Sequence, residues 1–127
     1  MKKNQIHIPI DLVPRPAEYE TSAAMIIAEY FGCDVEFIKR NQSSKTADFL
    51  IKGKIWELKS PIGDGKRTIQ NNLRKADKQS KNIILDLRRC KMNSAQAMSR
   101  VRFELGRANN ISHLYVIQKN KNVVALR

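Results

Sequence analysis

Apolar residues recur along the chain with two kinds of spacing, which together predict one α/β domain over residues 1–127. A spacing of three or four residues indicates a helix, whereas alternation or a short β-branched run indicates a strand. We expect helices at residues 17–31, 68–80 and 94–107, and strands at residues 35–38, 46–51, 54–60, 82–87, 113–118 and 123–126. The order is therefore helix, three strands, helix, strand, helix and hairpin.

Prolines and glycines mark the boundaries of these elements. Residues 1–15 contain Pro9 and Pro14, and each proline removes an N–H donor and pushes the preceding residue toward extended backbone. We therefore expect residues 1–15 to form an extended N-terminal arm. Gly32 ends the pattern of the first helix. Between two strand-like runs, Lys52-Gly53 predicts a tight hairpin turn.

The predicted hairpin places two acids opposite each other. In a hairpin centred on Lys52-Gly53, Asp48 faces Glu57, and alternation puts both on the same face as Lys59. The apolar residues of the hairpin project from the other face: Ala47, Phe49, Ile51, Trp56 and Leu58. Opposed carboxylates repel unless a cation lies between them, and Mg²⁺ is commonly held by one or two carboxylates and several waters. The alternative is an ordinary solvated face.

Two more residues fit a metal-assisted phosphodiester hydrolysis site. Lys59 is placed to stabilise developing negative charge or to position an attacking water. Glu20 lies on the apolar stripe of the first helix, where an acid without a partner is costly, so we expect it to be a third acid near the metal. The alternative for Glu20 is an acid in the first turn that the helix dipole stabilises.

The charge balance narrows the class of partner. The 127 residues contain 24 Lys and Arg against 12 Asp and Glu, a formal net charge of +12, which favours a nucleic-acid partner. No segment approaches the ~20 apolar residues of a membrane span, and no signal-peptide pattern opens the chain. Cys33 and Cys90 have no disulfide or zinc spacing. One Trp, three Tyr and four Phe leave little for base stacking.

The polar helix at residues 68–80 supplies candidate substrate contacts. Gln79 follows Ala76 by three residues on the expected sheet-facing side, where its amide would orient a water or a phosphate, or make a buried hydrogen bond. Arg67 and Thr68 open the helix, whose N–H groups suit a phosphate; capping by Thr68 is the alternative. The helix also carries cations that would neutralise phosphates, namely Arg74, Lys75 and Lys78.

The order of acids and lysine resembles a nuclease core. Asp48, then Glu57-Leu58-Lys59 on a hairpin after a helix with Glu20, resembles the PD-(D/E)XK core of restriction endonucleases. More narrowly, about residues 17–90 are similar to the C-terminal tRNA nuclease domains of CdiA toxins of contact-dependent growth inhibition. The similarity lies in Glu20-Thr21, Lys45-Thr46-Ala47-Asp48-Phe49, Ile55-Trp56-Glu57-Leu58-Lys59-Ser60-Pro61, Lys66-Arg67-Thr68-Ile69, Ala76 with Gln79-Ser80, and Ile83-Ile84-Leu85-Asp86-Leu87. Ala47 stands where such cores often have proline.

The resemblance implies a restriction-endonuclease-like α/β fold, with a central mixed β-sheet flanked by helices. It implies a metal-dependent tRNA nuclease, with Glu20, Asp48 and Glu57 as metal-site acids and Lys59 as the catalytic lysine. Mg²⁺ is the expected ion, with Mn²⁺ or Zn²⁺ as alternatives. The resemblance also implies a cognate immunity protein, commonly acidic, which a charge of +12 would attract. It further implies a toxin secreted or delivered from the cell surface that acts in the target-cell cytoplasm; a free-standing chain would be cytoplasmic.

Three alternatives remain open from the sequence. A DNA endonuclease fits the same acids and lysine, which are indifferent to the sugar. A basic nucleic-acid-binding module without catalysis fits the charge alone. A metal-independent RNase would use His7 and His113 as acid and base, although neither lies in a recognisable constellation.

Overall fold

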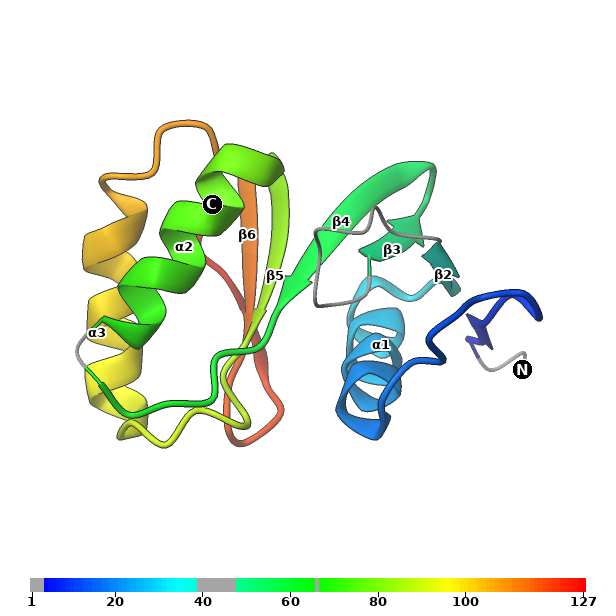
Figure 1. Ribbon diagram of the computed structural model, residues 1–127, viewed down its shortest axis with the longest axis horizontal. Helices are drawn as coiled ribbons and strands as arrows, with labels where there is room; N and C mark the ends of the chain where they lie inside the picture. Colours follow the sequence, from blue (N-terminus) through cyan, green and yellow to red (C-terminus); the bar gives the residue numbers. More distant parts are fainter. Residues whose placement is uncertain (1–3, 39–47, 66) are drawn as a thin grey trace. The chain divides into compact units, whose positions relative to one another are not determined.

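The computed structural model describes residues 4–38, 48–65 and 67–127, and shows a mixed α/β fold (Figure 1). The elements are β1 (Ile6–His7), α1 (Glu18–Phe31), β2 (Val35–Ile38), β3 (Asp48–Ile51), β4 (Lys54–Lys59), α2 (Thr68–Gln79), β5 (Asn82–Asp86), α3 (Ser94–Leu105), β6 (His113–Ile117) and β7 (Val123–Ala125). By its internal contacts the chain divides into an N-terminal unit, residues 1–58, and a C-terminal unit, residues 59–127. No helix in the described ranges has the length and hydrophobicity that a membrane span requires.

The predicted elements are confirmed in type and order, and their ends differ by one or two residues at most where both ends are described. The predicted start of the second strand, at Thr46, lies outside the described residues. The structure adds β1, which pairs in parallel with β2. The Nε2 atom of His7 lies 3.0 Å from Asp34 Oδ2, and the Gln5 N–H donates to Asp34 Oδ1 at 2.8 Å. The expected extended arm therefore contributes an edge strand.

In the N-terminal unit, α1 packs on a sheet with the strand order β1-β2-β3-β4. Gly32 ends α1 in the left-handed conformation, at φ 67°, where a residue without a Cβ is favoured. The rings of Phe37 and Phe49, on adjacent strands, lie 5.0 Å apart between centroids. The ring of Phe31, at the end of α1, lies 5.8 Å from that of Trp56. Helix α1 therefore covers the apolar face of the hairpin.

The turn between β3 and β4 fixes the register of the hairpin. Lys52 and Gly53 have φ values of 49° and 79°, and two positive φ values in a two-residue loop are the signature of a type I′ turn. Asp48 is paired with Glu57 and Phe49 with Trp56, which confirms the predicted register. Phe49 and Trp56 are buried, as alternation requires of residues that face α1.

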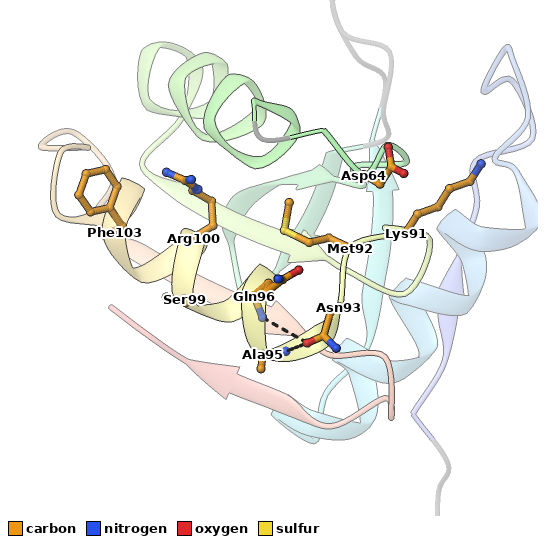
Figure 2. A pocket seen from close by; sticks show the side chains of 9 residues that line it. All are labelled: Asp64, Lys91, Met92, Asn93, Ala95, Gln96, Ser99, Arg100 and Phe103. Carbon is orange, nitrogen blue, oxygen red and sulfur yellow. Dashed lines mark hydrogen bonds between the residues drawn. The ribbon is translucent and has the colours of Figure 1, made fainter.

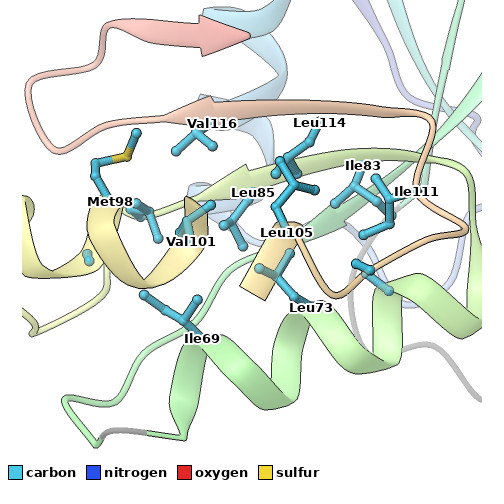
Figure 3. Close-up of a cluster of buried hydrophobic side chains, with 14 of the residues drawn as sticks. Ile69, Leu73, Ile83, Leu85, Met98, Val101, Leu105, Ile111, Leu114 and Val116 are labelled. Atoms are coloured by element: carbon cyan, nitrogen blue, oxygen red, sulfur yellow. The ribbon is translucent and has the colours of Figure 1, made fainter. Parts of the chain in front are cut away.

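In the C-terminal unit, α2 and α3 pack on a sheet of β5, β6 and β7. Strand β6 runs parallel to β5 and antiparallel to β7. Figure 3 shows the apolar cluster that joins the helices to β5 and β6. The cluster includes Ile69, Leu73, Ala76, Ile83, Leu85, Ala97, Met98, Val101, Leu105, Leu114 and Val116. The predicted apolar faces of both helices are therefore confirmed.

A buried ion pair joins Asp86, the last residue of β5, to Arg88. The Asp86 carboxylate is fully buried and accepts from Arg88 Nε at 2.9 Å, from Arg88 Nη2 at 2.8 Å and from the Arg88 N–H at 3.0 Å. Taking a carboxylate out of water is costly unless a cation and hydrogen bonds compensate. Arg88 supplies both to an acid that would otherwise disrupt an apolar strand.

Candidate functional site

Two carboxylates lie opposite each other on the β3–β4 hairpin. Asp48, the first described residue of β3, is the register partner of Glu57 in β4. Directly opposed residues of an antiparallel pair have Cβ atoms about 4.5–5.5 Å apart. Glu57 is only 5% exposed, and Asp48 is partly buried. Two carboxylates at this spacing provide hard oxygen ligands of the type that Mg²⁺ prefers.

The hairpin positions these acids because its side chains alternate between two faces. Trp56 and Leu58, the chain neighbours of Glu57, are buried on the face that meets α1. Alternation therefore turns the Glu57 side chain to the opposite face, where Asp48 lies. A carboxylate that is almost wholly removed from water is expensive to keep charged without compensation. At 5% exposure, Glu57 is not part of a solvated acidic face.

Lys59 ends β4 and contacts the end of α2. Its Nζ atom donates to Gln79 Oε1 at 3.1 Å. Lys59 follows Glu57 by two residues in one strand, so both side chains project to the same side of β4. Gln79, the last residue of α2, is exposed, so the alternative of a buried amide hydrogen bond is not observed. Its amide oxygen instead orients the lysine amine.

Glu20 takes the alternative that the sequence left open. Its carboxylate is buried, at 4% exposure, and Oε1 accepts from the Ala17 N–H at 2.9 Å, which caps the first turn of α1. In the described part of the chain, no group of three or more His, Cys, Asp or Glu residues is arranged to hold a metal ion. The expected cluster of Glu20, Asp48 and Glu57 is therefore not assembled, although Asp48 and Glu57 are paired.

The predicted substrate contacts lie along α2. Arg67 precedes the first helical residue and is exposed, and its side chain makes no capping hydrogen bond. The Thr68 N–H donates to Gly65 O at 3.1 Å. Because Arg67 rather than Thr68 occupies the N-cap position, the alternative of Thr68 as the cap is not observed. The other predicted cations of this helix, Arg74, Lys75 and Lys78, are exposed. Four residues of the segments that resemble CdiA toxin domains lie outside the described residues: Lys45, Thr46, Ala47 and Lys66.

The C-terminal unit also contains a hollow that the sequence did not predict (Figure 2). Its volume is about 800 Å³, and it lies beside α3 between Lys91 and Phe103. Phe103 is 56% exposed, and Arg100 lies next to it on the helix. The sequence signal for this hollow was Phe103, an aromatic residue that lies outside the apolar stripe of α3. The stripe consists of Ala97, Met98, Val101 and Leu105.

Comparison with known proteins finds a matching protein family and a similar solved structure. Residues 45–123 match the family described as the contact-dependent growth inhibition CdiA C-terminal domain. The curated proteins give no match. The structure is similar to a chain of the CdiA-CT/CdiI toxin and immunity complex from Burkholderia pseudomallei. The TM-score is 0.62 and the identity 17%, with 98% of this chain and 99% of that chain covered. Because the family match spans more than half of the sequence, the chain belongs to the contact-dependent growth inhibition CdiA C-terminal domain family.

Proposed function

We propose that this chain is a metal-dependent endoribonuclease that cleaves tRNA as the toxin domain of a contact-dependent growth inhibition system. The pairing of Asp48 with Glu57, with Lys59 two residues farther along β4, is the observation that carries the proposal. The order of helix, hairpin acids and lysine supports a core of the PD-(D/E)XK type. Membership of the CdiA C-terminal domain family supports the role of a toxin.

The acid pair fits a hard divalent cation, with Mg²⁺ as the first candidate and Mn²⁺ or Zn²⁺ as alternatives. Asp48 and Glu57 would hold the ion through carboxylate oxygens from adjacent strands. A bound cation would neutralise phosphate charge and favour loss of a proton from water. Both acids lie on a hairpin whose register is fixed by the Lys52-Gly53 turn.

The remaining residues would act on the substrate itself. The Lys59 amine is a point charge suited to a phosphate oxygen that gains negative charge during cleavage. Gln79 holds that amine through the hydrogen bond at 3.1 Å and is therefore a positioning residue. Arg67, Thr68, Arg74, Lys75 and Lys78 would bind and orient the RNA backbone.

Cleavage of tRNA should require a divalent cation. We expect total tRNA to be cut with Mg²⁺ and to stay intact with EDTA, because chelation removes the ion that would neutralise phosphate charge and favour loss of a proton from water. Gel analysis of tRNA and plasmid DNA, each with Mg²⁺ and with EDTA, measures this. Preferential cutting of plasmid would indicate a DNA endonuclease instead. Equal RNA cleavage in EDTA would reject the metal-dependent mechanism.

Replacing Glu20 by glutamine should separate a metal role from a capping role. Glutamine also serves in the capping box, so Glu20→Gln should leave the free energy of unfolding within about 1 kcal/mol of wild type. We expect tRNA cleavage to stay within about twofold of wild type, because the Glu20 carboxylate caps α1 and is not grouped with Asp48 and Glu57 in the described part of the chain. Glu18→Gln, on the exposed side of the same turn, is the control and should cleave normally. A loss of about tenfold or more in Glu20→Gln would instead assign the Glu20 carboxylate to the metal site.

We also propose that a cognate immunity protein neutralises this chain. The similar Burkholderia pseudomallei structure is a complex of a toxin with its immunity protein. A net charge of +12 favours an acidic partner, because complementary charge accelerates association. The proposed tRNA substrate places the action of the toxin in the target-cell cytoplasm.

A further inference from the structure

We propose that α3 in the C-terminal unit binds an unpaired nucleotide of the RNA substrate, with the base stacked on Phe103 and the phosphates held by arginines. The inference rests on the proposed function, because it takes RNA as the substrate. It assigns a binding role to residues outside the acid pair and outside α2.

Phe103 is the aromatic surface of this proposed site. It lies on α3 and is 56% exposed, whereas Val101 and Leu105 of the same helix are buried in the apolar cluster. A single exposed apolar side chain is ordinary on a protein surface and does not by itself indicate a ligand. The surroundings of the ring therefore decide what it can bind.

Two arginines flank this ring. The guanidinium carbons of Arg100 and Arg107 lie 5.8 and 5.9 Å from the ring centroid of Phe103. These distances are within the ~6 Å range of cation–π contacts. Arg100 precedes Phe103 by three residues and Arg107 follows it by four, the spacings that bring side chains together along a helix. An aromatic ring and guanidinium planes are both surfaces on which unpaired bases stack.

The same arginines suit the phosphates beside a stacked base. A guanidinium presents a planar fork of donors that matches a phosphate, so one residue can stack and another can neutralise charge. The Nη1 atom of Arg100 lies 3.9 Å from Glu104 Oε1, beyond close hydrogen-bond distance, and Glu104 is buried. This ion pair leaves the Arg100 side chain 38% exposed, so a phosphate can reach its guanidinium. The N–H groups of the Arg100 guanidinium can therefore donate to a phosphate of the substrate.

The hollow next to Phe103 has the size and chemistry for a nucleotide. Its volume of about 800 Å³ falls within the range of about 300–1,000 Å³ that is typical of ligand sites. Figure 2 shows Phe103 and Lys91 at its two ends, with Gln96 and Ser99 between them. Amide and hydroxyl groups can donate to and accept from base edges. Lys91 and Arg100 outnumber the one acid that lines the hollow, Asp64.

The N-terminus of α3 is not the basis of this site. Asn93 Oδ1 accepts from the N–H groups of Ala95 at 2.9 Å and Gln96 at 3.4 Å, so the helix supplies its own cap. The cations that would meet phosphate are side chains farther along the hollow and the helix. Base stacking next to these cations distinguishes the proposed ligand from a simple polyanion.

Binding to labelled single-stranded RNA tests the inference. We would measure Kd by fluorescence anisotropy at fixed salt in the Glu57→Gln background, where cleavage does not consume the probe. Phe103→Ala should weaken binding about fivefold to a hundredfold, the range for loss of a base–aromatic stack, and Phe103→Trp should stay within about twofold of the background. Tyr30→Ala removes an exposed ring from α1 and is the matched control, with an unchanged Kd. Urea unfolding verifies that each variant is folded.

Inorganic polyphosphate separates stacking from charge. Phe103→Ala should leave polyphosphate affinity unchanged, whereas Arg100→Gln should lower RNA affinity and reduce the salt dependence by about one counterion. An unchanged RNA affinity in Phe103→Ala, or equal weakening for RNA and polyphosphate, would overturn the inference. If the wild type cleaves RNA and Phe103→Ala does not change binding, the inference about Phe103 is rejected and the proposed function stays in place. Weakened RNA binding in a chain that cuts no RNA would leave the binding site and reject the nuclease.

Discussion

Glu57→Gln should reduce tRNA cleavage by about a hundredfold or more while the protein stays folded. The substitution keeps the size of the side chain and its place opposite Asp48, but it removes the negative charge that would bind a cation. Changes to residues that only support a metal ligand already cost about 10- to 100-fold, so loss of a ligand should cost at least as much. Initial rates at saturating Mg²⁺, with urea unfolding in parallel, measure the two effects.

The matched control for Glu57→Gln is Glu36→Gln. Glu36 lies on β2 of the same sheet but is exposed and is paired with Leu50, so its loss should leave the cleavage rate within about twofold. If raising the Mg²⁺ concentration partly restores the rate of Glu57→Gln, the loss lies in ion binding. A Glu57→Gln rate within tenfold of wild type would remove Glu57 from the metal site.

Lys59→Ala should have the second large effect, a loss of about 100- to 1,000-fold in the cleavage rate. This is the range observed when one donor to a developing negative charge is removed. The substitution also leaves Gln79 without the hydrogen bond at 3.1 Å, but Gln79 is exposed and water can replace the amine. We therefore expect the free energy of unfolding to change by less than about 1 kcal/mol. Single-turnover cleavage of tRNA separates this loss of rate from weaker binding.

Lys54→Ala provides the comparison on the same strand. Lys54 is exposed at the start of β4 and carries the same charge, so it reports any general effect of lowering the net charge by one. Cleavage by Lys54→Ala should stay near the wild-type rate, and binding should weaken only slightly. Equal losses in Lys54→Ala and Lys59→Ala would assign Lys59 to general charge rather than to the reaction.

The hairpin was predictable because several local rules agree there. Period-two alternation placed Phe49 and Trp56 on one face, and the turn residues Lys52-Gly53 fixed which acids face each other. Each rule depends on neighbours within a few positions. A short hairpin with one apolar face therefore carries nearly all the information needed for its own register.

The side chains of Glu20 and Gln79 were harder to predict from sequence. Helical spacing gave their faces, but a glutamate in the first turn can bond the helix start or reach away from it, and both directions fit one pattern. Gln79 ends α2, where a helix boundary uncertain by a residue changes burial. Strand β1, with two residues, is too short for any periodicity. The Phe103 surface depends on the three-dimensional grouping of side chains from α3 and the loop before it.

The type I′ turn at Lys52-Gly53 has a consequence for how this chain can vary. Side chains alternate with a period of two, so a one-residue change in that loop that shifts the register of β4 would turn the β4 side chains to the opposite face of the sheet. Glu57 would then point toward the apolar interior, and the Trp56 ring would meet water. Changes of loop length at this position would therefore separate the proposed acid pair, and sequence drift there should be confined to replacements that preserve two left-handed residues.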